Sequence, residues 1–260
     1  MNKPNPVVLC VAGFDPTGGA GLLADAGVIA SLGLRAAGVV TAMTTQRPAA
    51  PVTVAPRPAA EIVQEIKTLV ADLRPAAVKI GMVGCAANAD AVADALAEMA
   101  WPVPVVIDPV LTAGAGGDLA GNASYDRLLA HGTWVTPNVP EAVKLTGLAV
   151  DDLTGMRRAA AMLRERGPRY VLIKGGHLTG DPVDLLVGPE GEETFSTPRI
   201  GSGRQVHGTG CALSSLIAGY LALGETPAIA ARRAVATVRR GIEAAWAPST
   251  DGWMYLGISG

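Results

Sequence analysis

Short, uninterrupted runs of apolar residues alternate with longer amphipathic segments along most of the chain. An apolar run without alternation is typical of a strand buried on both faces, as in a parallel sheet. The apolar runs predict strands at residues 7–12, 38–43, 52–55, 77–80, 103–107, 133–136 and 170–173. The segments between them predict helices at residues 22–32, 58–72, 88–99, 140–145 and 151–166. Strands that alternate with helices indicate an α/β fold with a doubly wound, mostly parallel sheet.

The C-terminal third departs from this alternation. Two short segments around Gly188-Pro189-Glu190-Gly191, at 183–187 and 192–196, predict an antiparallel hairpin. A polar, Gly-rich loop at 201–208 then leads into two helices, expected at 209–223 and 227–246, and the tail at 247–260 has no clear pattern. No change of composition requires a second domain, so we expect residues 1–260 to form one domain.

Composition excludes several classes of partner. Hydrophobic residues make up 49% of the chain and the net charge is −2, without a basic run. Phosphate-backbone binding needs clustered Lys and Arg, so we expect neither nucleic acid nor a membrane as partner. No apolar run approaches the ~18 residues of a membrane span. The three cysteines cannot all pair and residues 1–6 do not read as a signal peptide, which together favour a cytoplasmic protein with reduced thiols.

Residues that can bind a ligand follow the ends of the predicted strands. In open α/β sheets, ligands bind outside the carboxyl ends of the strands. The residues placed there are Gly13, Gln46, Met82, Asp108, Asn138 and Lys174. Taken singly, Asp108 could open a turn, Asn138 could cap the helix that holds Glu141, and Lys174 could be a solvated charge. Their shared placement nevertheless predicts a site at this edge.

The stretch 207–215 reads as an anion hole at the start of a helix. A helix start leaves backbone N–H groups without partners, and Gly208 and Gly210 have no side chains that would block a close approach. Cys211 falls in the first turn, where the helix dipole is expected to favour thiolate over thiol. The alternative is an ordinary helix with Thr209 as its cap and Cys211 as a small buried apolar residue.

This combination suits phosphoryl transfer, which needs charge stabilisation more than covalent help from the protein. Asp108 and Glu141 are candidate ligands for Mg²⁺, Lys174 is a candidate phosphate clamp, and the backbone at 208–210 could neutralise developing charge. The chain lacks Gly-x-x-x-x-Gly-Lys-Ser/Thr, and Leu213 stands where a dinucleotide-binding fingerprint would have its third glycine.

Six ordered motifs resemble those of the ribokinase superfamily, and within it the hydroxymethylpyrimidine/phosphomethylpyrimidine kinases of thiamine biosynthesis. The motifs are AGFDPTGGAG at 12–21, VKIGM at 78–82, DPV at 108–110, TPNVPEA at 136–142, IKGGH at 173–177 and HGTGC at 207–211. The resemblance extends from about residue 7 to residue 238. It implies a ribokinase-like three-layer fold with helices on both faces of the sheet, and a homodimer.

The resemblance also implies a role for each matched residue. The pyrimidine would lie near Gly13, Asp25, Gln46, Met82, Val110 and Cys211. Asp25 and Gln46 would hydrogen-bond the ring, and Met82 and Val110 would pack on its faces. ATP and its Mg²⁺ would be bound by Asn138, Glu141, Lys174 and Thr209, with Asp108 helping to position the metal. Cys211, typical of the pyrimidine branch, would take the alcohol proton.

The implied reaction has two steps. ATP would phosphorylate 4-amino-5-hydroxymethyl-2-methylpyrimidine and then its monophosphate. The chain departs from many relatives at Phe14, Leu23 and Arg47-Pro48, around the substrate loop. One alternative is therefore a pyridoxal or pyridoxine kinase, since those substrates are also hydroxymethylated aromatic rings. Another is a non-catalytic nucleotide-binding protein on the same fold. For His177 and His207 we expect hydrogen bonding within loops rather than catalysis.

Overall fold

The computed structural model describes residues 5–46, 52–112, 119, 124–200, 206–248 and 254–258. Its strands are β1 (Val7–Phe14), β2 (Arg35–Thr45), β3 (Thr53–Pro56), β4 (Ala77–Ile80), β5 (Val105–Ile107), β6 (Trp134–Val135), β7 (Tyr170–Ile173), β8 (Val183–Gly188), β9 (Gly191–Ser196), β10 (Val206–His207) and β11 (Met254–Tyr255). Its helices are α1 (Gly21–Ser31), α2 (Ala59–Leu73), α3 (Ala86–Ala97), α4 (Asp126–His131), α5 (Val139–Thr146), α6 (Leu153–Glu165), α7 (Thr209–Ala222) and α8 (Pro227–Glu243).

One nine-stranded sheet organises the fold, in the order β3-β2-β1-β4-β5-β6-β7-β8-β9. The strands from β2 to β7 in this order pair in parallel, while β3 and the β8–β9 hairpin pair antiparallel at the two edges. The chain places β2 on one side of β1 and β4 on the other, so the strand order reverses at β1. This switch point is where doubly wound sheets bind their ligands.

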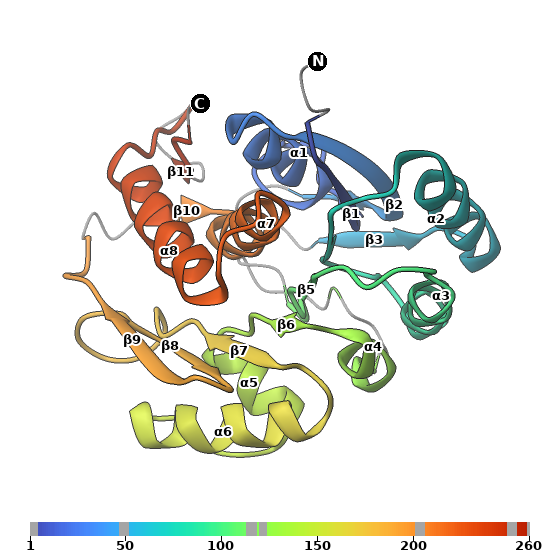
Figure 1. The fold of residues 1–260 in the computed structure, drawn as a ribbon. Helices are drawn as coiled ribbons and strands as arrows, with labels where there is room; N and C mark the ends of the chain where they lie inside the picture. The colour runs from blue at the N-terminus through green and yellow to red at the C-terminus, as the bar shows by residue number, and fades with distance from the viewer. Residues whose placement is uncertain are drawn as a thin grey trace.

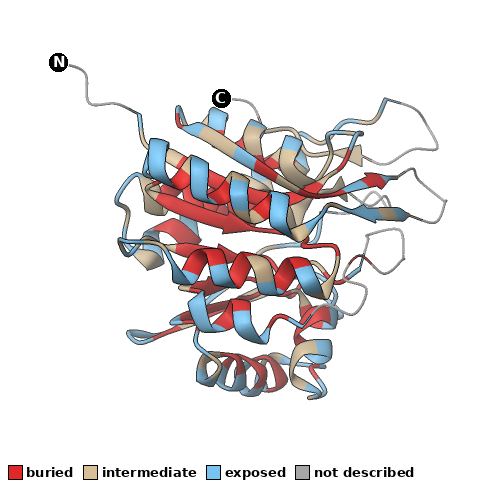
Figure 2. Ribbon diagram, turned by 90° about the vertical axis from the view of Figure 1, so that its right-hand side faces the viewer, coloured by how far each residue is buried: buried red, intermediate tan, exposed pale blue. Residues whose placement is uncertain are grey.

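Helices cover both faces of the sheet, as Figure 1 shows. Alternate residues of β1 serve the two layers: Val8 and Cys10 pack with the helices α1, α7 and α8, whereas Leu9 and Val11 pack with the layer formed by α2 to α6. Because both faces are covered, the central strands are almost wholly apolar. The helices bury one side and expose the other, as the colouring of Figure 2 makes clear. The expected three-layer α/β fold is confirmed.

Most predicted elements agree with the structure to within a few residues, and β4 and β7 agree at both ends. The sequence did not predict α4, β10 or β11. Helix α4 has six residues, too few to establish a helical period, and β10 and β11 have two residues each. The tail expected to have no pattern therefore contributes a strand, which pairs in parallel with β10. Within the described part of the chain, every helix is too short or too polar to traverse a bilayer.

Candidate active site

The carboxyl ends of β1, β4, β5 and β7 meet the N-terminus of α7 at the switch point of the sheet. Asp108 follows β5, Lys174 follows β7, and Glu141 lies in the first turn of α5. Lys174 Nζ lies 2.9 Å from Asp108 Oδ1 and 3.9 Å from Glu141 Oε2. The structure thus brings together three residues that the sequence placed at separate strand ends.

Electrostatics in this trio depend on burial and on the single lysine between two acids. Burial alone would raise the pKa of Asp108, but Lys174 and then Lys79 hold it below its ordinary value. Burial raises the pKa of Glu141 to about 7 against the attraction of Lys174. Burial would lower the pKa of Lys174, yet the two carboxylates keep it above its ordinary value. Lys174 and Asp108 are therefore an ion pair at neutral pH, and Glu141 gains or loses its proton close to neutral pH.

Asn138 and Glu141 form a complete capping box at the start of α5. Asn138 Oδ1 accepts the backbone N–H of Glu141 at 2.8 Å, and Glu141 Oε2 accepts the backbone N–H of Asn138 at 2.7 Å. The alternative interpretation of Asn138 as a helix cap is confirmed. This cap also orients the Glu141 carboxylate, because Oε2 is the oxygen that faces Lys174.

The first turn of α7 lies against the Lys174–Asp108 pair. A Cβ on Gly210 would come 2.9 Å from Lys174 Nζ and 3.9 Å from Asp108 Oδ2. Gly208 is the N-cap, with φ +80°, and no side chain caps the helix. The interpretation of Thr209 as the cap is thus wrong, since Thr209 is the first helical residue. The N–H groups of this turn have no partner within the helix and are available to an anion. Residues 201–205 of the expected Gly-rich loop lie outside the described residues.

The expectation that the helix start favours a Cys211 thiolate is contradicted by the structure. Burial raises the pKa of Cys211 to about 12, with Asp108 and Asp25 acting in the same direction and Lys79 and the backbone N–H of Gly21 opposing them. Desolvation and nearby acids disfavour the thiolate. The thiol therefore keeps its proton at neutral pH.

Asp25 occupies a different environment from the one expected of a substrate contact. Its carboxylate lies 2.7 Å from Lys79 Nζ, and neither side chain is exposed at all. Ser215 Oγ donates to Asp25 Oδ1 at 2.8 Å. Burial opposes the charge of Lys79, but Asp25 holds the pKa of that ammonium above its ordinary value. Hydrogen bonding of Asp25 to a ring stays a prediction, and it would require access to this enclosed pair.

The other residues predicted to contact substrate lie at the ends of β1, β2, β4 and β5. A Cβ on Gly13 would come 2.9 Å from Met82 Sδ. Met82 also packs in a small apolar cluster with Val110. Gln46 Nε2 donates to Thr44 Oγ1, which in turn donates to the carbonyl of Phe14, at 2.9 Å each. Gly13, Gln46, Met82 and Val110 thus border one region next to the first turn of α7. Arg47 lies outside the described residues.

Sequence reasoning missed Lys79 and Asp15. Lys79 stands inside the otherwise apolar strand β4, and a lysine buried in a strand needs a buried acid as its partner. Asp25, an acid among Ala and Leu in α1, was the available signal. Asp15 is 1% exposed and lies 2.9 Å from Nε2 of His207, so the expectation of loop hydrogen bonding for His207 is confirmed.

The residues present fit one Mg²⁺ bound together with phosphates. Within the described ranges no group of three or more His, Cys, Asp or Glu could hold a metal alone. Asp108 and Glu141 supply carboxylate oxygens, and the missing Cβ of Gly210 leaves a cradle beside Asp108. Mg²⁺ is commonly held by one or two carboxylates, substrate phosphates and water, so this donor set suits it.

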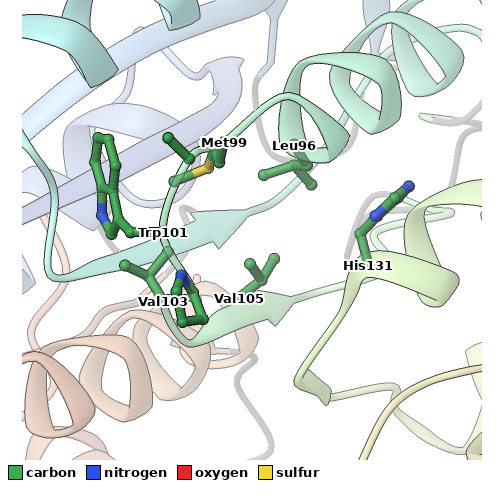
Figure 3. A pocket seen from close by; sticks show the side chains of 8 residues that line it. Leu96, Met99, Trp101, Val103, Val105 and His131 are labelled. Atoms are coloured by element: carbon green, nitrogen blue, oxygen red, sulfur yellow. The ribbon is translucent and has the colours of Figure 1, made fainter.

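A separate apolar pocket of about 380 Å³ lies at the opposite edge of the sheet (Figure 3). It surrounds Trp101 and Val105, which is the first residue of β5, while Asp108 follows the far end of that strand. None of the predicted site residues lines this pocket. The predicted site residues therefore lie at the carboxyl ends of the strands and not in this pocket.

Comparison with known proteins identifies the family. A family model described as phosphomethylpyrimidine kinase matches residues 15–252. A hydroxymethylpyrimidine/phosphomethylpyrimidine kinase of Streptomyces coelicolor is 39% identical over 258 residues, 95% of each chain. The crystal structure of phosphomethylpyrimidine kinase from Clostridium difficile is 31% identical, with a TM-score of 0.80 over 92% of this chain and 100% of that one. A Staphylococcus aureus pyridoxal kinase in complex with pyridoxal is 27% identical, with a TM-score of 0.88 over 98% of this chain and 95% of that one.

Proposed function

Because the chain belongs to the phosphomethylpyrimidine kinase family, we propose that it transfers phosphoryl groups from ATP to 4-amino-5-hydroxymethyl-2-methylpyrimidine and then to its monophosphate. The observation that carries this proposal is the Lys174–Asp108 pair lying against Gly210 at the start of α7. There a cation, a candidate metal-binding acid and the backbone N–H groups of a helix start meet.

Lys174 is the residue that changes partner in this mechanism. Its Nζ pairs with Asp108 and has Glu141 at 3.9 Å. When ATP binds, a phosphate oxygen competes for the ammonium. Asp108 and Glu141 would hold Mg²⁺, which would supply positive charge that offsets both acids and the phosphates. The first-turn N–H groups of α7 stabilise charge on the transferring group.

Cys211 is our candidate to receive the alcohol proton, and burial keeps it a thiol at neutral pH. It can act as the base only if bound ligands lower its pKa from about 12. The positive charge of Lys79 already acts in that direction. In a loose transition state the alcohol proton leaves late, so the demand on a base is modest. The second acceptor is an anionic phosphate oxygen and requires little or no base.

Replacing Cys211 with Ala separates these roles. We expect Cys211→Ala to lower kcat for the first phosphorylation by about 100-fold, the usual range for loss of a general base, and the second much less. ADP release should be measured with the pyrimidine and its monophosphate separately, with Cys211→Ser as the conservative variant. Equal losses in both steps would instead indicate a role in packing or in the anion hole.

The identity of the substrate can be tested with the wild-type protein, without any variant. ADP release with Mg-ATP should be measured on hydroxymethylpyrimidine, its monophosphate and pyridoxal. Turnover of both pyrimidines with weak turnover of pyridoxal supports the proposal. Preference for pyridoxal, with an inert monophosphate, would support the second candidate, which the likeness to the S. aureus pyridoxal kinase favours. The homodimer and the cytoplasmic location stay predictions.

A further inference from the structure

One carboxylate organises the loop after β1 and joins it to a strand far along the chain. Asp15 Oδ1 accepts the backbone N–H of Thr17 at 2.9 Å, and Oδ2 accepts that of Ala20 at 3.1 Å. Asp15 Oδ2 also lies 2.9 Å from Nε2 of His207 in β10. Burial would raise the pKa of Asp15, but the hydrogen bonds from His207 and Thr17 lower it, so the carboxylate accepts and the histidine nitrogen donates.

The loop after β1 and the residue that follows β10 also approach each other closely through their backbones. Gly208 has φ +80°, and a Cβ there would overlap the carbonyl oxygen of Gly19. A Cβ on Gly19 would in turn overlap the ring of His207. Only glycine fits the positive φ and the close approach at Gly208. Since Gly208 is the N-cap of α7 and directly follows His207, a shift of His207 is passed to the first turn of that helix.

The C-terminal segment supports His207 from its other side. Strand β11 pairs in parallel with β10, with Tyr255 opposite His207 in the register. The Tyr255 ring meets the His207 ring edge-on at 6.5 Å and stacks on Trp246 at 5.5 Å. The backbone N–H of Gly257 donates to Gly241 in α8 at 3.0 Å, which anchors this segment.

We propose that His207 is a positioning residue for phosphoryl transfer. Paired with Asp15 and supported by Tyr255, it fixes the first turn of α7 against the loop after β1, so that the backbone N–H groups of the turn are aimed before substrate binds. This proposal rests on the proposed function and deepens it. Donors fixed in advance need no reorganisation during the reaction, and their benefit is felt in the transition state more than in ground-state binding. His207 itself transfers no proton.

The test compares His207→Ala with His207→Gln by steady-state kinetics. We expect His207→Ala to lower kcat about 100-fold, because misplacement by about 1 Å costs this much. KM for ATP and for hydroxymethylpyrimidine should stay within about threefold, since ground-state contacts remain. His207→Gln should restore most of kcat, because its amide nitrogen can donate to Asp15. The matched control is His131→Gln in α4, at the opposite edge of the sheet, which should leave kcat unchanged.

Tyr255 provides a second and milder variant. Tyr255→Ala should lower kcat in the same direction but by less than His207→Ala, while Tyr255→Phe, which keeps the ring, should match the wild type. This pair decides the question if His207→Ala does not fold. Wild-type kcat in both alanine variants, or a His207→Gln variant as slow as His207→Ala, would overturn the positioning role. Absence of turnover in the wild type would overturn the proposed function instead, so the two failures are distinguishable.

Discussion

Two lysine–aspartate ion pairs flank the first two turns of α7, and they differ in their access to solvent. Lys79 and Asp25 are fully enclosed, whereas 15% of the Lys174 side chain is exposed beside Asp108. Ser215 of α7 binds the enclosed pair, and Gly210 lies against the accessible one. A lysine–aspartate ion pair therefore contacts α7 at two places, once enclosed and once open to solvent.

The two pairs differ in whether the lysine has a second group to bind. Lys174 has a second carboxylate, Glu141, at 3.9 Å, and its exposed part gives a phosphate group a route to the ammonium. Lys79 donates to both oxygens of Asp25, at 2.8 and 2.7 Å, and no solvent reaches either side chain. The enclosed pair joins α1, β4 and α7, and we predict that the accessible pair is released to substrate.

The largest expected effect follows from breaking the enclosed pair. Lys79→Met should lower the free energy of unfolding by about 3–5 kcal/mol, because it leaves the Asp25 charge buried without its partner. Urea unfolding measures this change. The double variant Lys79→Met/Asp25→Asn should recover much of the loss, because it removes both charges.

The matched control for Lys79 is Lys67, whose pair with Glu98 is exposed on both sides. Lys67→Met should change the free energy of unfolding by less than about 1 kcal/mol, the usual value of a surface pair. If Lys79→Met unfolds at the same urea concentration as Lys67→Met, the enclosed pair does not hold the three elements together.

Breaking the accessible pair should reduce activity more than stability. Lys174→Met is expected to lower kcat about 100- to 1000-fold, the range for losing one preorganised group that stabilises transition-state charge. Its free energy of unfolding should fall less than that of Lys79→Met, since Asp108 keeps the nearby charge of Lys79 and the hydroxyl donor of Thr136. ADP release and urea unfolding on the same preparation check both expectations. A Lys174→Met variant with wild-type kcat would contradict the comparison.

The contrast between the two pairs also explains what the sequence could predict. Lys174 and Asp108 follow apolar strands, so the rule that ligands bind at carboxyl ends located them, while the glycines before a helix located the start of α7. The strands of the parallel sheet were predictable from uninterrupted apolar runs, and most helices from their hydrophobic period. Helix α4 is too short to establish a helical period, and β10 and β11 lie in segments that we expected to be a loop and a tail without a pattern, so these three elements were missed.

Contacts between distant segments were beyond sequence reasoning. Lys79 is 54 residues from Asp25 in the sequence, and Asp15 is 192 residues from His207. Only the fold brings the members of each pair together. The ionisation of Cys211 was misjudged for a related reason. The dipole of a helix start is local and visible in the sequence, whereas desolvation and the charges of Asp108 and Asp25 depend on packing.

The smallest expected effects come from the neighbouring serines of α7, one beside each pair. Ser215 Oγ donates to Asp25 at 2.8 Å, so Ser215→Ala should cost about 1.5–3 kcal/mol of unfolding free energy, as for a buried bond to a charged group. Ser214 Oγ lies 3.4 Å from Asp108 and 2.9 Å from the Cys211 carbonyl within its own helix. Ser214→Ala should therefore cost only about 0.5–1 kcal/mol. Parallel urea unfolding of the two variants measures the difference. A larger loss for Ser214→Ala would mean that α7 is held by the accessible pair, and the division of labour between the two pairs would have to be reversed.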